Sequence, residues 1–161
     1  MGVPRRGVVR YAIVGLGHIA QVAVLPAFAH AQRNSRVVAL VSDDPVKLSI
    51  LSKRYHIENT YSYDEYDSCL EEVDAVYIAL PNSMHAEYTV RAARAGVHVL
   101  CEKPMAVTVD ECRRMIKACR DHRVKLMIAY RLHFEEILAN TRRPNPNAAR
   151  GIGEIVDQSK F

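Results

Sequence analysis

The sequence predicts an α/β fold built on a doubly wound parallel sheet. Short apolar runs alternate along the chain with segments of helical periodicity, as in right-handed βαβ units. Most of these runs carry no charge, which is typical of strands buried on both faces. The first run, 11–14, leads through the glycine pattern GLGHIA at 15–20 into a helical segment, which is typical of a parallel sheet that binds a ligand.

Six extended runs are expected to form the sheet. Five are rich in Val, Ile, Leu and Ala, and the third is a brief extended piece. In chain order they cover residues 11–14, 36–41, 59–61, 75–80, 97–101 and 125–130.

Helical segments are expected between the strands, at residues 19–31, 44–55, 63–72, 85–95 and 109–121. Pro26 predicts a kink or a restart in the first. The second has Asp44 at its cap and Pro45 at its first helical position. We expect it to turn four side chains inward: Val46, Leu48, Leu51 and Tyr55. The fourth ends at Gly96, a left-handed cap.

Composition excludes several classes of protein. The 161 residues are 49% hydrophobic and 25% charged, as in a globular protein, and no run is long enough to span a membrane. The net charge of +4 is scattered, so we expect no nucleic-acid binding. Arg5 and Arg6 lack a following apolar export segment, and we expect a cytoplasmic location. The four cysteines form no C-x-x-C pair and predict reduced thiols, with no metal site.

The glycine turn is the first candidate site. Gly15 and Gly17 let the chain turn sharply and bring its backbone against a ligand. The helix start at His18 and Ile19 would offer free N–H groups to a pyrophosphate, as in dinucleotide-binding folds. The alternative is a purely structural strand–turn–helix connection.

The end of the second strand bears on the choice between NADP and NAD. Ser42 followed by Lys47 favours the extra phosphate of NADP, while Asp43 favours the ribose hydroxyls of NAD. The sequence favours NADP, with NAD as the alternative. A structural interpretation also stands, in which Ser42 is a turn residue and Lys47 a solvated lysine.

Two more strand ends carry polar residues. After the fourth strand, Leu80 leads to Asn82 and His85, which would project toward a nicotinamide. Asn82 or Ser83 could also cap the next helix, and the two roles are compatible.

After the fifth strand come Glu102, Lys103 and Pro104. A lysine at this rim, which we expect to be partly desolvated, suits proton transfer to or from a substrate hydroxyl.

The motifs GLGHIA, ALPNSMHAEY, CEKPMAVTVDEC and AYRLHF together resemble the Gfo/Idh/MocA oxidoreductases, over residues 10–134. The resemblance implies a Rossmann domain that binds NAD(P) and a second α/β domain that binds a sugar or polyol and mediates oligomerisation. It implies that Lys103 is the catalytic lysine and that Glu102, Asn82, His85 and Arg131 surround the nicotinamide and its ribose. It also implies a cis Lys103–Pro104 peptide.

The resemblance divides the chain into an NAD(P)-binding domain, 1–134, and a linker with the start of a truncated second domain, 135–161. Pro144 and Pro146 interrupt the region where the family continues as a helix. The implied function is hydride transfer between nicotinamide and a carbinol carbon, with homo-oligomers expected only if the second domain is present. The alternative is a non-catalytic NAD(P)-binding module or regulatory subunit.

Overall fold

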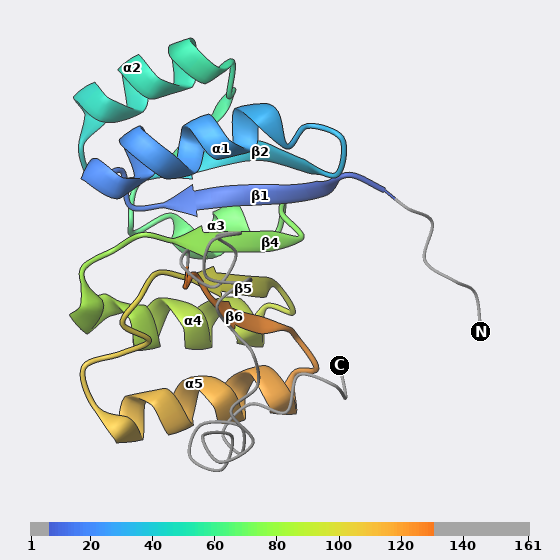
Figure 1. Cartoon of the computed structure of the whole chain (residues 1–161), viewed down its shortest axis with the longest axis vertical. Coiled ribbons are helices and arrows are strands. Elements are labelled where there is room, and N and C mark those ends of the chain that lie inside the picture. Colours follow the sequence, from blue (N-terminus) through green and yellow to red (C-terminus); the bar gives the residue numbers. More distant parts are fainter. Residues whose placement is uncertain (1–6, 131–161) are drawn as a thin grey trace, which may run out of the picture. The chain divides into compact units, whose positions relative to one another are not determined.

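Buried strands organise residues 7–130, the part of the chain that the computed structural model describes (Figure 1). The strands are β1 (Val9–Val14), β2 (Ser35–Val41), β3 (Asn59–Tyr61), β4 (Ala75–Ile78), β5 (His98–Cys101) and β6 (Leu126–Ile128). They form a six-stranded sheet in the order β3-β2-β1-β4-β5-β6, and every neighbouring pair is parallel. This is the strand order of the Rossmann fold, so the predicted fold class is confirmed.

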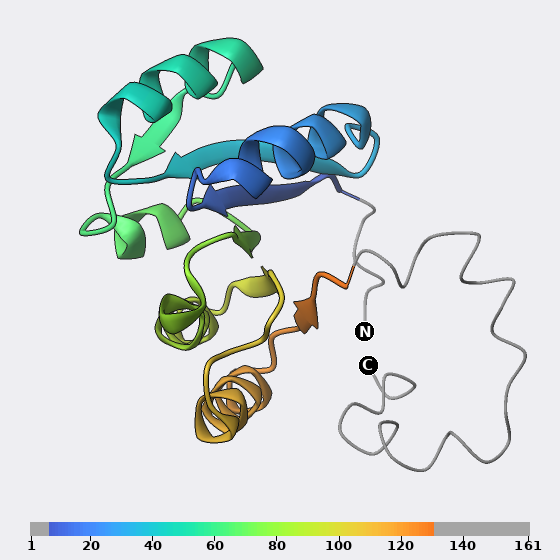
Figure 2. The same cartoon turned by 60° about the vertical axis from the view of Figure 1, so that its left-hand side comes forward.

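Helices lie on both faces of this sheet. They are η1 (Ala20–Val24), α1 (Leu25–His30), α2 (Pro45–Tyr55), α3 (Tyr66–Leu70), η2 (Asn82–Met84), α4 (His85–Arg94) and α5 (Val109–Asp121). Buried side chains of η1, α1 and α2 share one apolar cluster, and those of α3, α4 and α5 share another. Figure 2 shows the sheet running from α2 and β3 at one end to β6 and α5 at the other.

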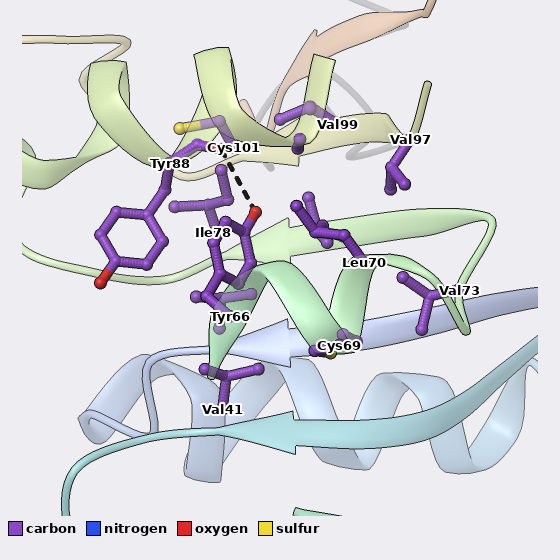
Figure 3. Close-up of a cluster of buried hydrophobic side chains, with 14 of the residues drawn as sticks. Val41, Tyr66, Cys69, Leu70, Val73, Ile78, Tyr88, Val97, Val99 and Cys101 are labelled. Atoms are coloured by element: carbon purple, nitrogen blue, oxygen red, sulfur yellow. Dashed lines mark hydrogen bonds between the residues drawn. The ribbon is translucent and has the colours of Figure 1, made fainter. Parts of the chain in front are cut away.

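The two clusters arise from the alternation of side chains along each strand. Ala12 and Val14 of β1 face the α3–α5 cluster, while Ile13 between them faces the η1–α2 cluster. In the α3–α5 cluster the Tyr66 hydroxyl donates to the carbonyl of Tyr88, at 3.2 Å (Figure 3). That bond satisfies the polar end of a fully buried ring.

Pro26 produces the predicted restart in the first helical segment. The helix opens as a π-helical turn, η1, in which the Leu25 N–H donates to the carbonyl of Ala20. The α1 helix then begins at Leu25, with Pro26 in its first turn. Proline has no N–H to donate to the preceding turn, which accounts for a restart of the helix at this point.

Caps fix the ends of α2, α4 and α5. Asp44 Oδ1 accepts from the N–H groups of Val46 and Lys47, as its predicted cap role requires, and Gly96 has a φ of +78° after α4. At the start of α5, Thr108 and Glu111 form a capping box. One expectation for α2 is wrong, because the Val46 side chain is 64% exposed.

Several element boundaries differ from the prediction by a few residues. Helix α3 is shorter than 63–72, since the Glu65 carboxylate accepts from the Ser62 N–H and hydroxyl and closes a turn before it. Strands β4 and β6 each end two residues before their predicted ends, at Ile78 and Ile128.

The predicted absences can be compared only with residues 7–130. Within that range no group of His, Cys, Asp and Glu could hold a metal ion, and no helix is long and apolar enough to cross a membrane. The four cysteines are free thiols, and Cys112 is the least buried of them. Arg131, the expected domain boundary at 134 and the segment 135–161 lie outside the described residues.

Candidate functional site

The carboxyl ends of β1, β2 and β4 enclose a cavity of about 410 Å³. It lies where the strand order reverses, between β1 and β4, which is where open parallel sheets bind ligands. Its lining comes from the turns that follow these three strands and from the loop after β3: Gly15, Leu16, Gly17, Ser42, Asp43, Asp44, Lys47, Tyr63, Ala79, Leu80 and Pro81.

The two glycines of the first turn have different roles. Gly15 has a φ of +91°, and a Cβ there would lie 2.7 Å from the carbonyl oxygen of Ala79. Only glycine fits this contact between the ends of β1 and β4. A Cβ on Gly17 would meet nothing within 4 Å, so its missing side chain leaves open space beside the cavity. His18 is exposed and Ile19 half-buried at the start of the helix that follows.

The turn after β2 is held by its own polar side chains. The buried Ser42 hydroxyl accepts from the Asp44 N–H at 3.2 Å, so Ser42 is a turn residue as well as a cavity residue. Lys47 pairs with Asp44, with 3.0 Å between Nζ and Oδ2. The N–H and ammonium of Lys47 hold the pKa of the Asp44 carboxyl below its ordinary value.

Asp43 is committed in part to the neighbouring loop. Its Oδ1 accepts from the Tyr63 N–H at 2.8 Å, across 20 residues of sequence. Burial is the main reason that the pKa of the Tyr63 hydroxyl is raised. The carboxylate therefore holds the loop after β3 against the cavity.

Beyond β4, Asn82 and His85 occupy very different surroundings. Asn82 is exposed at the start of η2, and neither it nor Ser83 caps α4, whose N-cap residue is Met84 without a side-chain bond. The expected role as a cap is therefore wrong.

His85 is 1% exposed and lies between two backbone carbonyls, with Nδ1 2.9 Å from the Pro104 oxygen and Nε2 2.9 Å from the Leu80 oxygen. It thus ties the end of β4 to the segment after β5. Contact between His85 and a coenzyme stays a prediction.

After β5 the chain buries an acid and exposes a base. Glu102 is 8% exposed, whereas Lys103 is exposed among the described residues, and its expected partial desolvation beside a bound nicotinamide stays a prediction. The Lys103–Pro104 peptide is cis, as the resemblance implied. Among residues 7–130 no ion pair engages the Lys103 ammonium.

Tyr77 is the site residue that the sequence analysis missed. Its hydroxyl donates to Glu102 Oε1 at 2.6 Å, within the range of a bond to a charged carboxylate. The available signal was one tyrosine in the otherwise aliphatic strand AVYI, because a buried tyrosine hydroxyl needs a partner.

The structure therefore gathers only part of the predicted set around the cavity. The predicted residues that line it are Gly15, Gly17, Ser42, Lys47 and Leu80. Four others do not line it but follow the ends of β4 and β5 on the same edge of the sheet: Asn82, His85, Glu102 and Lys103.

Comparison with known proteins assigns this arrangement to a family. The model of the Gfo/Idh/MocA oxidoreductases, described as "Oxidoreductase family, NAD-binding Rossmann fold", matches residues 9–130. The chain belongs to this family. The match spans every strand of the sheet and all the strand-end turns described above.

Three Gfo/Idh/MocA relatives illustrate the similarity. An uncharacterized oxidoreductase, ORF334, of Rhizobium meliloti is 41% identical over 130 residues, which cover 78% of this chain and 38% of that protein. D-xylose 1-dehydrogenase [NADP(+)] of Haloarcula marismortui is 33% identical over 79% of this chain and 36% of that protein. The crystal structure of aldose-aldose oxidoreductase from Caulobacter crescentus is 47% identical, with a TM-score of 0.76, over 80% of this chain and 39% of that one.

The chain thus spans about two fifths of the length of these Gfo/Idh/MocA relatives. The matched part is the NAD-binding domain, and relatives of this group include NAD(P)-dependent sugar dehydrogenases. Coenzyme contacts of individual residues stay predictions, since no comparison bears on them.

Proposed function

We propose that this chain is the NADP(H)-binding domain of an oxidoreductase that transfers hydride between nicotinamide and a carbinol carbon of a sugar or polyol. The observation that carries the proposal is the glycine turn at the switch point of a Gfo/Idh/MocA sheet. There Gly15 packs against Ala79 and Gly17 leaves open space beside a cavity of about 410 Å³. A dinucleotide fits such a turn because its pyrophosphate needs close backbone approach and N–H donors.

Several features of the cavity support NADP over NAD. Lys47 and the Ser42 hydroxyl both line it, so a cation and a hydroxyl are available to an adenosine 2′-phosphate. Asp43, the residue that would favour NAD, already accepts from the Tyr63 N–H. The similarity to an NADP-dependent xylose dehydrogenase agrees with this choice. On binding, Lys47 would share its charge between Asp44 and the phosphate.

Lys103 is the proposed proton carrier. When bound, the nicotinamide ring supplies the hydride acceptor and donor. As a substrate is oxidised, the neutral amine of Lys103 would take the proton of the reacting hydroxyl and become the ammonium, and in reduction the ammonium would return that proton. Its exposed ammonium, with no ion pair among residues 7–130, leaves it available for that role. Glu102, Asn82, His85 and Arg131 would surround the nicotinamide and its ribose.

We also propose the domain division at residue 134, with the substrate bound by a second domain that begins in 135–161. Homo-oligomers would form through that second domain. The competing function is a binding module without turnover.

Two measurements test the proposal. Calorimetric titration of the chain with NADP and with NAD should give saturable heat, with tighter binding of NADP; no heat with either coenzyme would refute it. Mixing the chain with NADPH or NADP and candidate sugars, while following the absorbance of the reduced coenzyme, separates enzyme from module. Saturable binding without any turnover, even at high protein concentration, would favour the module.

A further inference from the structure

Tyr77 lies in β4 between the glycine turn and the Glu102 segment. It is aligned with Ile13 of β1 on one side and with Leu100 of β5 on the other. Its ring meets Phe28 of α1 edge-on, with 6.2 Å between ring centroids, and Phe28 in turn contacts Tyr11 at 4.8 Å. One buried ring therefore links the helix after the glycine turn to the strand that precedes the candidate lysine.

The hydroxyl of this ring contacts the buried acid beside Lys103. The distance from Tyr77 Oη to Glu102 Oε1 is 2.6 Å, and Glu102 Oε2 accepts a longer bond from the Lys103 N–H at 3.3 Å. A carboxylate at 8% exposure has little water to orient it. Its direction depends on these protein donors, because an unpaired buried charge is costly.

We propose that Tyr77 is a positioning residue for the nicotinamide half of the coenzyme, acting through Glu102. Its hydroxyl fixes the Glu102 carboxylate, and Glu102 fixes the start of the Lys103 segment against the nicotinamide ribose. This inference rests on the proposed function, since it assumes that a nicotinamide coenzyme lies along these strand ends. Binding of the adenosine half of the coenzyme should not depend on Tyr77.

Packing alone does not account for a hydroxyl at this position. A phenylalanine would keep the ring contact with Phe28 and the same place in the sheet. It would lose the short bond to a buried carboxylate, which is stronger than a bond between neutral groups. The geometry is therefore that of a support for Glu102 rather than of a filler in the core.

The test compares Tyr77→Phe with Tyr11→Phe. The control removes one hydroxyl from the same chain of rings, and among residues 7–130 the Tyr11 hydroxyl makes no hydrogen bond. The probes are NADPH and its adenosine half, adenosine 2′,5′-bisphosphate (or NADH and ADP if NAD proves to be the preferred coenzyme). We expect Tyr77→Phe to weaken the binding of NADPH about tenfold. The fluorescence of the bound NADPH should also fall. Its affinity for the half-molecule should stay within about twofold of the wild type.

A double-mutant cycle with Glu102→Gln completes the test. If Tyr77 acts through Glu102, the two substitutions together should weaken NADPH binding about as much as either substitution alone. Additive losses would overturn the inference. The inference would also be overturned if Tyr77→Phe bound NADPH as tightly as Tyr11→Phe does. It would likewise be overturned if Tyr77→Phe lost as much affinity for the adenosine half as for NADPH. If the wild type binds neither probe, the proposed function fails and the inference with it. If the wild type binds both, only the inference is at stake.

Discussion

The ends of β2 and β5 each carry an acid and a lysine, but the two turns treat these charges in opposite ways. After β2, Asp44 and Lys47 lie at the surface, 38% and 46% exposed, and pair with each other. After β5, Glu102 is buried under the Tyr77 hydroxyl, while the Lys103 ammonium is exposed and has no ion pair among residues 7–130.

The difference indicates a division of labour along one edge of the sheet. A surface pair in water contributes little to stability and can exchange one partner for a ligand phosphate. A buried, hydrogen-bonded carboxylate cannot move without losing its donors, so it suits the fixing of a geometry. On the proposed function, the β2 turn would select a coenzyme by charge, and the β5 turn would hold a reacting group in place.

The largest expected effect comes from a substitution at Gly15, in the turn after β1, which packs against Ala79 after β4. Gly15→Ala would place a Cβ 2.7 Å from the Ala79 oxygen at a φ of +91°. We expect the free energy of unfolding to fall by about 2–4 kcal/mol, from left-handed strain and overpacking together. Urea unfolding of the purified variant measures it.

Gly17→Ala is the matched control, since a Cβ there has no neighbour within 4 Å. Its unfolding free energy should stay within about 1 kcal/mol of the wild type. Its coenzyme affinity should nevertheless fall at least about tenfold, because the new methyl group occupies the approach of the pyrophosphate. Normal coenzyme affinity in this variant would contradict the placement of the pyrophosphate.

Lys103→Ala breaks the β5 turn alone. Loss of the proton carrier should lower the rate of hydride transfer by about 10²–10⁴-fold, while coenzyme affinity changes less than about threefold. On the proposed function, the rate is followed through the absorbance of the reduced coenzyme during sugar oxidation, and the affinity is measured by calorimetry on this chain. Lys125→Ala, at another exposed lysine, should change neither. Unchanged turnover in Lys103→Ala would show that another group carries the proton.

Local patterns in the sequence predicted most of the fold, and contacts between distant residues account for what they missed. Apolar runs located five of the six strands, and the Asp44 cap and the Gly96 turn were local signals. By contrast, β1 begins at Val9, two residues early, because Arg10 pairs with Asp74 across 64 residues.

The candidate site shows the same limit. The glycines and the β2 turn were readable because their sequence signals, the glycine spacing and the Asp44 cap, lie within a few residues. The burial of His85 depends on the carbonyl of Pro104, 19 residues away, and the role of Tyr77 depends on Glu102, 25 residues away. No spacing rule joins such pairs before the sheet brings β4 and β5 together.

Lys47→Glu reverses the charge of the β2 turn and sharpens the comparison. NADP affinity should fall about 10–100-fold through loss of a charge-assisted contact to the 2′-phosphate. NAD affinity should change less than about threefold. Lys53→Glu makes the same charge change on an exposed position of α2 that does not line the cavity, and it controls for general electrostatics. Equal losses of NAD and NADP in Lys47→Glu would refute the phosphate contact.

The smallest expected effect concerns the acid of the β2 turn at low pH. The N–H and ammonium of Lys47 lower the pKa of Asp44 from its ordinary value of 3.8. A carboxyl with a lowered folded pKa contributes stability that is present above the unfolded pKa and is lost as the pH falls through the folded pKa. Asp44→Asn keeps a good helix cap but removes this charge, so its unfolding free energy should fall less steeply than that of the wild type below about pH 4.

Urea unfolding at a series of pH values measures these slopes, and Asp64→Asn serves as the control. Asp64 is exposed and makes no hydrogen bond or ion pair among residues 7–130, so its variant should follow the wild-type curve. If Asp44→Asn also follows that curve, the Asp44–Lys47 pair is too weak to constrain either partner. The lysine would then be free to turn toward a phosphate without competition, and the contrast with the buried Glu102 would become sharper.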